Sequence, residues 1–275
     1  MRRRVAVSVV AIAAMLSGAT AATAATFGEP DNGEHPFVGL IYFETPDGIF
    51  RCSGTLMSPD VVLTAGHCTE SAGGVVNSRT WVSFTEQIVI PDDILALPDD
   101  EFADYLDARG DFISGQAVPH PDYADFADFP RTFDVGLVLL DEPVAMATYG
   151  ALPPRGLLET LSGRDKSGFT VVGYGLQGFI NPFFGEERAR YKGDVRLVEL
   201  KSTSNAGHSV KFTNNPGNGN GSGGSCFGDS GGPVLSGGNV VVAVVSWGIT
   251  PCIGVDYQFR IDTAIALDFV EPYLS

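Results

Sequence analysis

The stretch SCFGDSGGP, residues 225–233, decides how the rest of the chain is interpreted. It sets Ser230 among glycines, one residue after Asp229, which is typical of a nucleophile on a tight and exposed turn. Small neighbours let a substrate carbonyl come close, and free backbone N–H groups can face the negative charge that develops on it. The stretch therefore predicts a catalytic serine.

The order of the candidate residues separates two kinds of serine site. The glycine spacing around Ser230 also fits the strand-to-helix elbow of α/β hydrolases, which place their histidine after the serine. All four histidines of this chain precede Ser230: His35, His67, His120 and His208. The order histidine, acid, serine therefore remains, and the elbow is excluded. His35 precedes a proline and is expected in a solvated turn.

Two further motifs supply a candidate base and a candidate acid. TAGHC, residues 64–68, follows an apolar run and presents His67. FDVGLVLL, residues 133–140, places Asp134 at the head of an apolar strand. A histidine can take the proton of a serine hydroxyl, and a partly buried carboxylate can hold the imidazole in the required tautomer. The three motifs together predict nucleophilic catalysis.

With these motifs the chain resembles the chymotrypsin-like, trypsin-fold family of serine proteases. CSGTL at 52–56 and SWG at 246–248 match the family as well, and the five motifs occur in the family's order over nearly all of the chain. The resemblance implies an all-β fold of two antiparallel six-stranded β-barrels, with a C-terminal helix around residues 264–273.

The resemblance also implies a role for each site residue. His67 would be the general base, Asp134 its buried partner and Ser230 the nucleophile that forms an acyl-enzyme. The backbone N–H groups of Gly228 and Ser230 would form the oxyanion hole, and Ser246 matches the position that supports the buried aspartate. Polypeptide substrates are implied, with no cofactor and no metal. An esterase with the same triad and a catalytically inactive binding homologue remain as alternatives.

The expected specificity pocket favours a large apolar residue before the cleaved bond. Gly224, six positions before Ser230, stands at the expected base, where trypsin-type enzymes carry an aspartate that pairs with lysine or arginine. The other pocket residues that the resemblance implies are Phe227, Ser246, Trp247 and Gly248. One register of residues 252–260 would bring Asp256 into the pocket, and a basic preference would then follow.

Length and charge narrow the classes of partner. The chain has 275 residues, 44% of them hydrophobic, which suits one sizeable domain or two small barrels. Its formal net charge of −16 at pH 7 argues against nucleic acid and anionic membrane surfaces as partners. Polypeptide substrates follow from the resemblance alone, and we expect the protein to be a monomer.

The first 24 residues are predicted to be a signal peptide. Three arginines precede an apolar stretch at 5–16 that is too short to span a bilayer, and residues 22–24 form an A-x-A cleavage site. This pattern predicts secretion to the extracellular space; the arginine run leaves the twin-arginine route open, although the rest of that motif is missing. The remainder is expected to be one trypsin-like serine protease domain at 25–275, with barrels at about 25–145 and about 146–275.

Ala25 follows the cleavage site directly and is expected to activate the enzyme. In the family that the chain resembles, a new N-terminal amine pairs with the aspartate before the nucleophile and orders the oxyanion hole. We expect signal cleavage to expose the amine of Ala25 and that amine to pair with Asp229. The family prefers isoleucine or valine at this position, so alanine is a departure.

Four cysteines in an exported chain predict two disulfides, and the sequence alone permits three pairings. The resemblance selects Cys52 with Cys68 and Cys226 with Cys252. No C-x-x-C spacing supports a metal site instead.

Residues 91–111 are strongly acidic and form an insertion relative to the family. Asp99 is predicted to cap a short helix, whose apolar face would contain Phe102, Tyr105 and Leu106. The acids match no known calcium-loop spacing, so a solvated acidic surface helix is expected.

Overall fold

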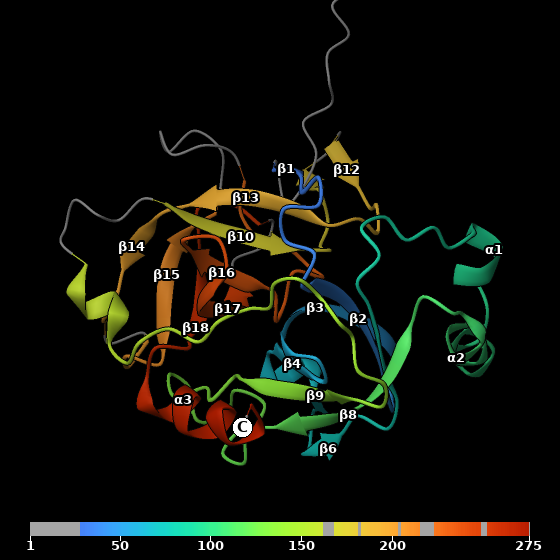
Figure 1. Ribbon diagram of the computed structural model, residues 1–275, viewed down its shortest axis with the longest axis horizontal. Coiled ribbons are helices and arrows are strands. Elements are labelled where there is room, and N and C mark those ends of the chain that lie inside the picture. Colours follow the sequence, from blue (N-terminus) through green and yellow to red (C-terminus); the bar gives the residue numbers. More distant parts are fainter. Residues whose placement is uncertain are drawn as a thin grey trace, which may run out of the picture.

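Two β-sheet bodies lie one above the other in the computed structural model (Figure 1). The structure describes residues 28–161, 168–180, 183–202, 205–214, 223–248 and 252–274. The predicted signal peptide and Ala25 lie outside these residues. The predicted all-β class is confirmed, because the described chain consists of strands with only short helices between and after them.

The first body is a closed barrel of six strands, as expected. Its strands follow the order β2-β3-β4-β9-β8-β7 around the barrel. Their bounds are β2 Val38–Thr45, β3 Gly48–Ser58, β4 Val61–Thr64, β7 Thr80–Ser83, β8 Ile113–Pro119 and β9 Gly136–Leu140. Thr64, the last residue of β4, pairs with Gly136, the first of β9. The chain that leaves β4 and the chain that enters β9 therefore lie side by side, and these segments carry His67 and Asp134.

The second body has eight strands where six were expected. They follow the order β1-β13-β10-β16-β17-β18-β15-β14. Their bounds are β1 Glu29–Pro30, β10 Phe169–Gly173, β13 Tyr191–Val195, β14 Leu197–Glu199, β15 Ser209–Thr213, β16 Pro233–Ser236, β17 Val240–Gly248 and β18 Val255–Arg260. Only Arg196 separates β13 from β14, and its carbonyl accepts a hydrogen bond from the backbone N–H of Thr213 at 2.9 Å. One bent segment thus contributes two strands, β13 near one edge of the sheet and β14 at the other edge. This division and the additional strand β1 account for the two strands beyond the expected six.

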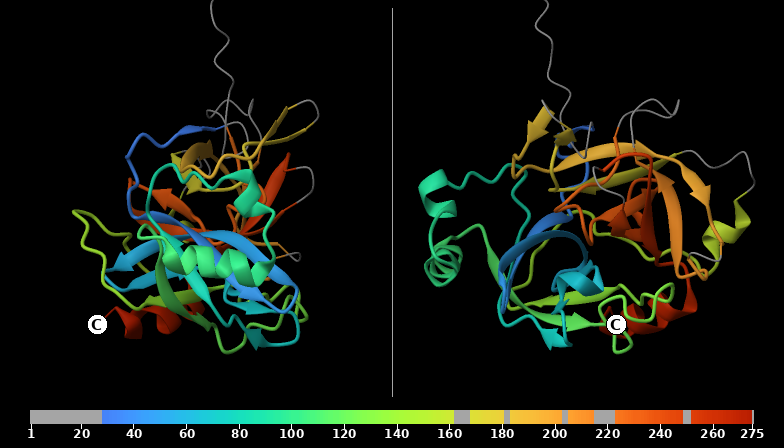
Figure 2. Two further views of the ribbon diagram at one scale, coloured as in Figure 1. Left: turned by 90° about the vertical axis from the view of Figure 1, so that its right-hand side faces the viewer. Right: turned by 180° about the vertical axis from the view of Figure 1, so that it is seen from behind.

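The C-terminal helix closes the chain as predicted. Helix α3 spans Ala264–Val270, and the 3-10 turn η3 spans Glu271–Tyr273. The Thr263 hydroxyl caps α3 by accepting a hydrogen bond from the N–H of Ala266. Ala266 and Val270 are buried in the same core cluster as β4 and β9. Figures 1 and 2 both show α3 beside the first barrel, so the end of the chain reaches back from the second body to the first.

Smaller elements lie between the strands of the two bodies. They are η1 Gly66–Cys68, β5 Glu70–Ser71, β6 Val75–Val76, η2 Leu157–Thr160, β11 Gly178–Ile180 and β12 Phe183–Gly185. No helix in the described part of the chain is long and apolar enough to cross a membrane.

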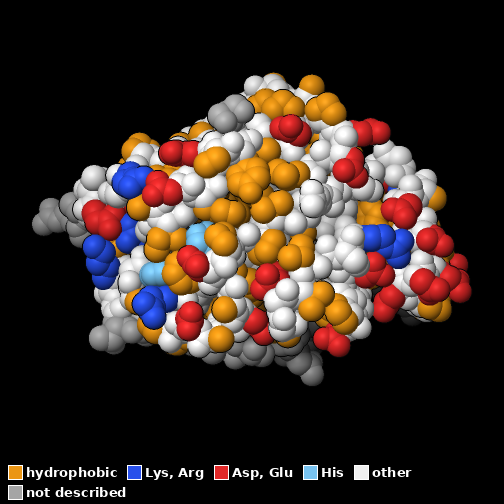
Figure 3. Space-filling view, turned by 90° about the horizontal axis from the view of Figure 1, so that it is seen from below, with side chains coloured by type: hydrophobic (Ala, Val, Ile, Leu, Met, Phe, Trp, Pro, Cys, Tyr) orange, Lys and Arg blue, Asp and Glu red, His pale blue; other side chains and the backbone are white. Residues whose placement is uncertain are grey.

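The acidic insertion forms two helices on the outside of the first barrel. Helix α1 spans Asp92–Leu95, and α2 spans Asp99–Ala108. Asp99 is the first residue of α2 and not its cap; Pro98 occupies the cap position, and no side chain caps the helix. The apolar side of α2 packs on the barrel: the Phe102 ring meets Tyr42 edge-on at 5.5 Å. Acidic side chains gather at this end of the molecule (Figure 3).

Candidate active site

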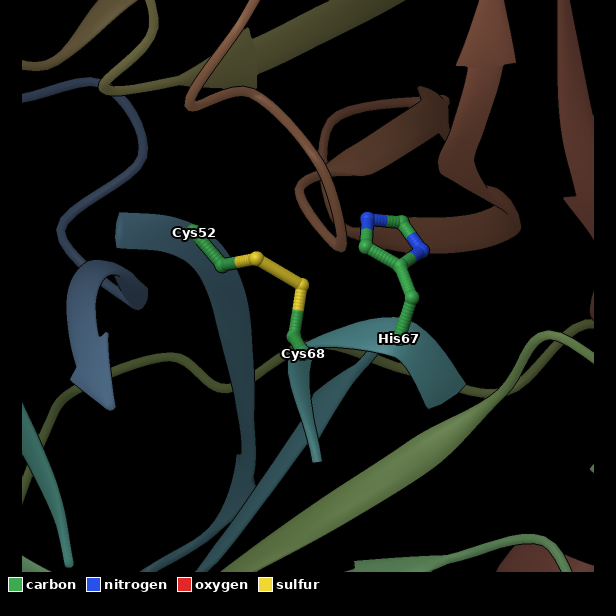
Figure 4. Close-up of side chains that lie close together, drawn as sticks. All are labelled: Cys52, His67 and Cys68. Atoms are coloured by element: carbon green, nitrogen blue, oxygen red, sulfur yellow. A yellow bond between two sulfur atoms is a disulfide. The ribbon is translucent and has the colours of Figure 1, made fainter. Parts of the chain in front are cut away.

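His67 lies on η1, the short turn that follows β4. The next residue, Cys68, forms a disulfide with Cys52 on β3 across a sequence separation of 16, which is the pairing that the resemblance implied. Figure 4 shows the His67 ring beside this bond. One potential metal-ligand atom from each of Cys52, His67 and Cys68 lies within 4.8 Å of the other two. The two sulfur atoms are bonded to each other, however, and offer no thiolate to a metal.

Asp134 is completely buried and accepts hydrogen bonds from three donor groups of two residues. The Nδ1 atom of His67 lies 3.1 and 3.0 Å from its two oxygens, and the backbone N–H of His67 donates to Oδ1 at 2.9 Å. The hydroxyl of Ser246, on β17, donates to Oδ2 at 2.5 Å. This arrangement fixes the imidazole with Nδ1 protonated and Nε2 free to accept a proton.

The pKa values of the two residues move in opposite directions. Burial raises the pKa of Asp134, but the charge and hydrogen bond of His67 and the bond from Ser246 outweigh it, so the pKa falls below its ordinary value. Burial lowers the pKa of His67, but Asp134 outweighs that effect and the pKa is raised above 6.5. The pair is therefore suited to hold a proton taken from a nucleophile.

Ser230 lies on a loop of the second body that is anchored to the first. The carbonyl of Ser230 accepts a hydrogen bond from the N–H of Ser53 at 2.8 Å, and the Ser53 hydroxyl donates to the carbonyl of Gly228 at 2.8 Å. Gly228 has φ +97°, a backbone conformation that only glycine adopts without strain. The loop therefore needs glycine at this position, two residues before the candidate nucleophile.

His67 and Ser230 line one groove of about 600 Å³. His67 and Ser230 both belong to the described part of the chain, and no hydrogen bond joins their side chains there. Such contacts are often long without substrate and tighten when the reacting group binds. The structure thus brings His67 and Ser230 to one cleft between the two bodies, and Asp134 lies buried against His67.

A second pocket of about 280 Å³ opens on the other side of Ser230. It is lined by Asn214, Ser225, Cys226, Phe227, Ser230, Val245, Ser246, Trp247, Gly248 and Cys252. Phe227 lies at the rim with 53% of its surface exposed, and the Trp247 ring stacks on Tyr257 at 3.6 Å. Cys226 and Cys252 form the second disulfide, again the pairing that the resemblance implied.

Gly224 does not line this pocket but is buried behind it. A Cβ on Gly224 would lie only 1.8 Å from Oδ1 of Asn214, so the glycine makes room for that amide. Asn214 and Ser225 are pocket residues that the sequence reasoning missed. Ser225 directly precedes Cys226, and this position in the sequence next to the serine loop could have identified it as a pocket residue. No sequence motif pointed to Asn214.

Asp256 lies next to the pocket because of the register between β17 and β18. Gly248, which lines the pocket, pairs with Asp256, so this acid lies beside the pocket wall. Asp256 is 2% exposed, and one of its oxygens accepts a hydrogen bond from the hydroxyl of Ser225. Its Oδ1, like Oδ1 of Asn214, has no hydrogen-bond partner among the described residues. Burial raises the pKa of Asp256 to about 7.

Asp229 is completely buried beneath the serine loop. Its carboxylate accepts hydrogen bonds from the N–H groups of Gly175 at 2.8 Å and Cys226 at 2.9 Å, and burial raises its pKa to about 6. Within the described residues no lysine, arginine or histidine forms an ion pair with it. The first described residue, Gly28, lies beside Gly223, six residues before Asp229 in the chain, since a Cβ on Gly223 would be 3.2 Å from the Cα of Gly28.

Comparison with known proteins agrees with this geometry. The family model described as Trypsin matches residues 27–270. CLIP domain-containing serine protease B15 of Anopheles gambiae is 29% identical over 276 residues, covering 90% of this chain and 70% of that protein. The trypsin of Saccharopolyspora erythraea is 29% identical over 231 residues, covering 78% and 82%. The solved structure of HL collagenase shares the fold, with a TM-score of 0.58 and 16% identity over 87% of this chain and 94% of that one.

Proposed function

The chain belongs to the trypsin family of serine proteases, and on that premise we propose that it is an active, secreted endopeptidase. The observation that carries the proposal is the buried Asp134, which holds His67 by Nδ1 beside the groove that Ser230 lines. A homologue that only binds a partner has no need of this arrangement.

The proposed reaction proceeds through an acyl-enzyme. Nε2 of His67 takes the proton of the Ser230 hydroxyl as Oγ attacks the carbonyl carbon of the peptide. The N–H groups of Gly228 and Ser230 stabilise the negative oxygen, and each such donor is worth about 3 kcal/mol of barrier in comparable sites. His67 then returns the proton to the leaving amine, and water releases the acyl group by the same steps.

The test is hydrolysis of a denatured protein by the purified enzyme and by its Ser230→Ala variant. We expect the enzyme to cut the protein and the variant to leave it intact. An esterase with the same triad would cleave small acyl esters and spare the protein. An inactive binding homologue would cleave neither.

We propose a preference for lysine or arginine before the cleaved bond. Gly224 led us to expect an apolar preference, but two buried acceptor oxygens without partners, on Asp256 and Asn214, favour a cationic side chain in the pocket. An ammonium or guanidinium group would supply the donors that these oxygens lack. Trp247 and Gly248 would hold the aliphatic part of that side chain.

Activation by signal cleavage is the second part of the proposal. Cleavage after residue 24 would free the amine of Ala25, three residues before Gly28, which lies near the serine loop. That amine would pair with Asp229, whose carboxylate forms no ion pair with a described residue. N-terminal sequencing of the secreted protein tests this, and a start other than Ala25 would discard it. Secretion of a monomer, with 25–275 as the protease domain, belongs to the same proposal.

A further inference from the structure

Arg51 lacks the hydrogen bonds that a buried guanidinium normally makes. It lies on β3 directly before Cys52, and its side chain is 13% exposed. The Arg51 side chain donates no hydrogen bond to any described residue, and its Nη1 is buried without a partner. Its one ion pair is loose, 3.4 Å from Nη2 to Glu186, whose side chain is 47% exposed. Because buried guanidinium groups are almost always satisfied, an acceptor from outside the chain would complete this one.

Arg51 lies immediately beside the candidate oxyanion hole. A Cβ on Gly228 would be 3.0 Å from its Nε. Arg51 also lines the 600 Å³ groove together with His67 and Ser230. An anion bound to Arg51 would therefore lie within a residue or two of the reacting bond.

This groove lies on the leaving-group side of the cleft. The 280 Å³ pocket is the proposed seat of the side chain before the cut, and Ser230 stands between the two depressions. His67, which must reach the leaving amine, lines the groove and not the pocket. The substrate chain after the cut therefore runs past Arg51.

A second arginine lies farther along the same path. A further depression of about 490 Å³ shares Phe50, Arg51 and Glu186 with the groove and also contains Arg188. Arg188 donates from Nε to the hydroxyl of Tyr42 at 2.8 Å, and its Nη2 lies 3.7 Å from Glu186. Two guanidinium groups thus share one half-exposed carboxylate, which leaves one positive charge unbalanced by that acid.

The acidic insertion forms the outer wall of this second depression. Leu95, Leu97 and Phe102 line it, together with the acid Asp99. Asp99 lies against the β2–β3 turn, since a Cβ on Gly48 would be 3.4 Å from its Oδ2, and Asp47 lines the groove near the same turn. These two acids would repel an anion at that turn, so the favourable position is beside Arg51.

We propose that Arg51, supported by Arg188, binds a carboxylate of the substrate just after the cleaved bond. The proposal rests on the proposed protease function and names the substrate class of its leaving-group side: peptides with an acidic residue one to three positions after the cut. A C-terminal carboxylate at that distance has the same chemistry.

The test compares peptides with the same residues before the cut and either glutamate or glutamine in the two positions after it. The intact enzyme should cleave the glutamate peptide about tenfold faster in kcat/KM, the factor expected for one charge-assisted hydrogen bond. Arg51→Gln should reduce this ratio to about one. Arg155→Gln is the matched control, because Arg155 is exposed and pairs with Asp268 away from the cleft; its ratio should stay near ten.

Two further arms complete the design. Peptides that end two residues after the cut, as free acid or as amide, separate a terminal carboxylate from a side-chain one; a preference in either pair that Arg51→Gln abolishes supports the proposal. For the wild-type enzyme, the ratio of kcat/KM for the glutamate peptide to that for the glutamine peptide should fall as salt rises from about 0.05 to about 1 M. This measurement does not depend on the folding of a variant.

Equal rates for the glutamate and glutamine peptides and for the acid and amide peptides would overturn the carboxylate site and leave the protease standing. A preference that survives in Arg51→Gln would overturn it as well. No cleavage of any peptide, including a peptidyl-coumarin without residues after the cut, would reject the proposed function itself.

Discussion

Replacing Asp256 with asparagine tests the proposed basic preference most severely. The substitution keeps the shape of the side chain and removes its charge. Asp256 is 2% exposed, and Ser225 donates a hydrogen bond to it, so a substrate cation would meet the carboxylate away from bulk water. Leaving one partner of such a buried charged pair unmatched costs about 2–5 kcal/mol.

That range sets the expected change in selectivity. At about 1.4 kcal/mol for each factor of ten, the preference for arginine over norleucine before the cut should fall by at least about thirtyfold. The wild-type preference should also depend on pH. Because burial raises the pKa of Asp256 to about 7, the carboxyl is neutral below that value and charged above it. The arginine preference should therefore grow as pH rises through about 7 and stay flat in the variant.

The assay measures kcat/KM for two peptides that differ only in the residue before the cut, between pH 6 and pH 9. Taking their ratio at each pH cancels the titration of His67, which affects both substrates equally. An unchanged ratio in Asp256→Asn, or a wild-type ratio independent of pH, would refute the placement of this carboxylate in the specificity pocket.

Stability provides a control on the same variant. The folded chain holds the Asp256 proton up to about pH 7, whereas the unfolded chain releases it near 3.8. The folded state therefore binds more protons in this window, and its contribution to stability declines as pH rises through it. At about 1.4 kcal/mol per pKa unit the cost is about 4 kcal/mol once the group is charged, so the variant should melt higher than wild type at pH 8.

Three further outcomes follow from the site and the disulfides. Ser246→Ala removes a hydrogen bond to the buried aspartate of the triad, so kcat should fall about tenfold or more with little change in KM; a kcat that matches wild type would contradict this role. Burial lowers the pKa of His67, but Asp134 raises it by more, so the net pKa lies above 6.5. Because the imidazole must be neutral to act as a base, activity should be lost as pH falls through a midpoint above 6.5. A kcat/KM profile with a lower midpoint would contradict this. Replacing Cys226 and Cys252 with serine opens a loop with a sequence separation of 26, so the free energy of unfolding should drop by about 3 kcal/mol in urea titrations, and an unchanged midpoint would count against a stabilising bridge.

The motifs of the chain predicted the parts of the site that depend on residue type. Base, acid and nucleophile occur at strand ends in a recognisable order, and the structure brings His67 and Asp134 together because β4 and β9 pair where those segments begin. The closed first barrel and the C-terminal helix were predicted from the resemblance to the family, and the structure confirms both.

Features that depend on pairing between distant segments could not be predicted. The register that brings Asp256 to the pocket follows from a bulge between Val245 and Trp247, and a shift by one residue would turn the acid to the other face. His35 was expected in a solvated turn but is 7% exposed, with its Nδ1 bonded to Asp31. Asp31 in turn receives a hydrogen bond from Arg190, a residue 159 positions away that no local pattern connects to it.

The second body and the insertion show the same limit. Arg196 alone separates β13 from β14, and neither Arg196 nor its two neighbours in the sequence is a glycine or proline that would predict a break in the strand. The apolar face of α2 was predicted from the sequence. Its packing against Tyr42, and its contribution to the wall of the depression beside Arg51, were not predicted.

The central claim is that Ser230 is a nucleophile activated by His67, and covalent labelling tests it most directly. The secreted, disulfide-bonded protein would be treated with a fluorophosphonate, digested and examined by mass spectrometry, in parallel with His67→Ala. The account predicts one phosphonate adduct, on Ser230, that disappears in the variant. An adduct on a different side chain, or no adduct on the folded wild-type protein, would contradict it.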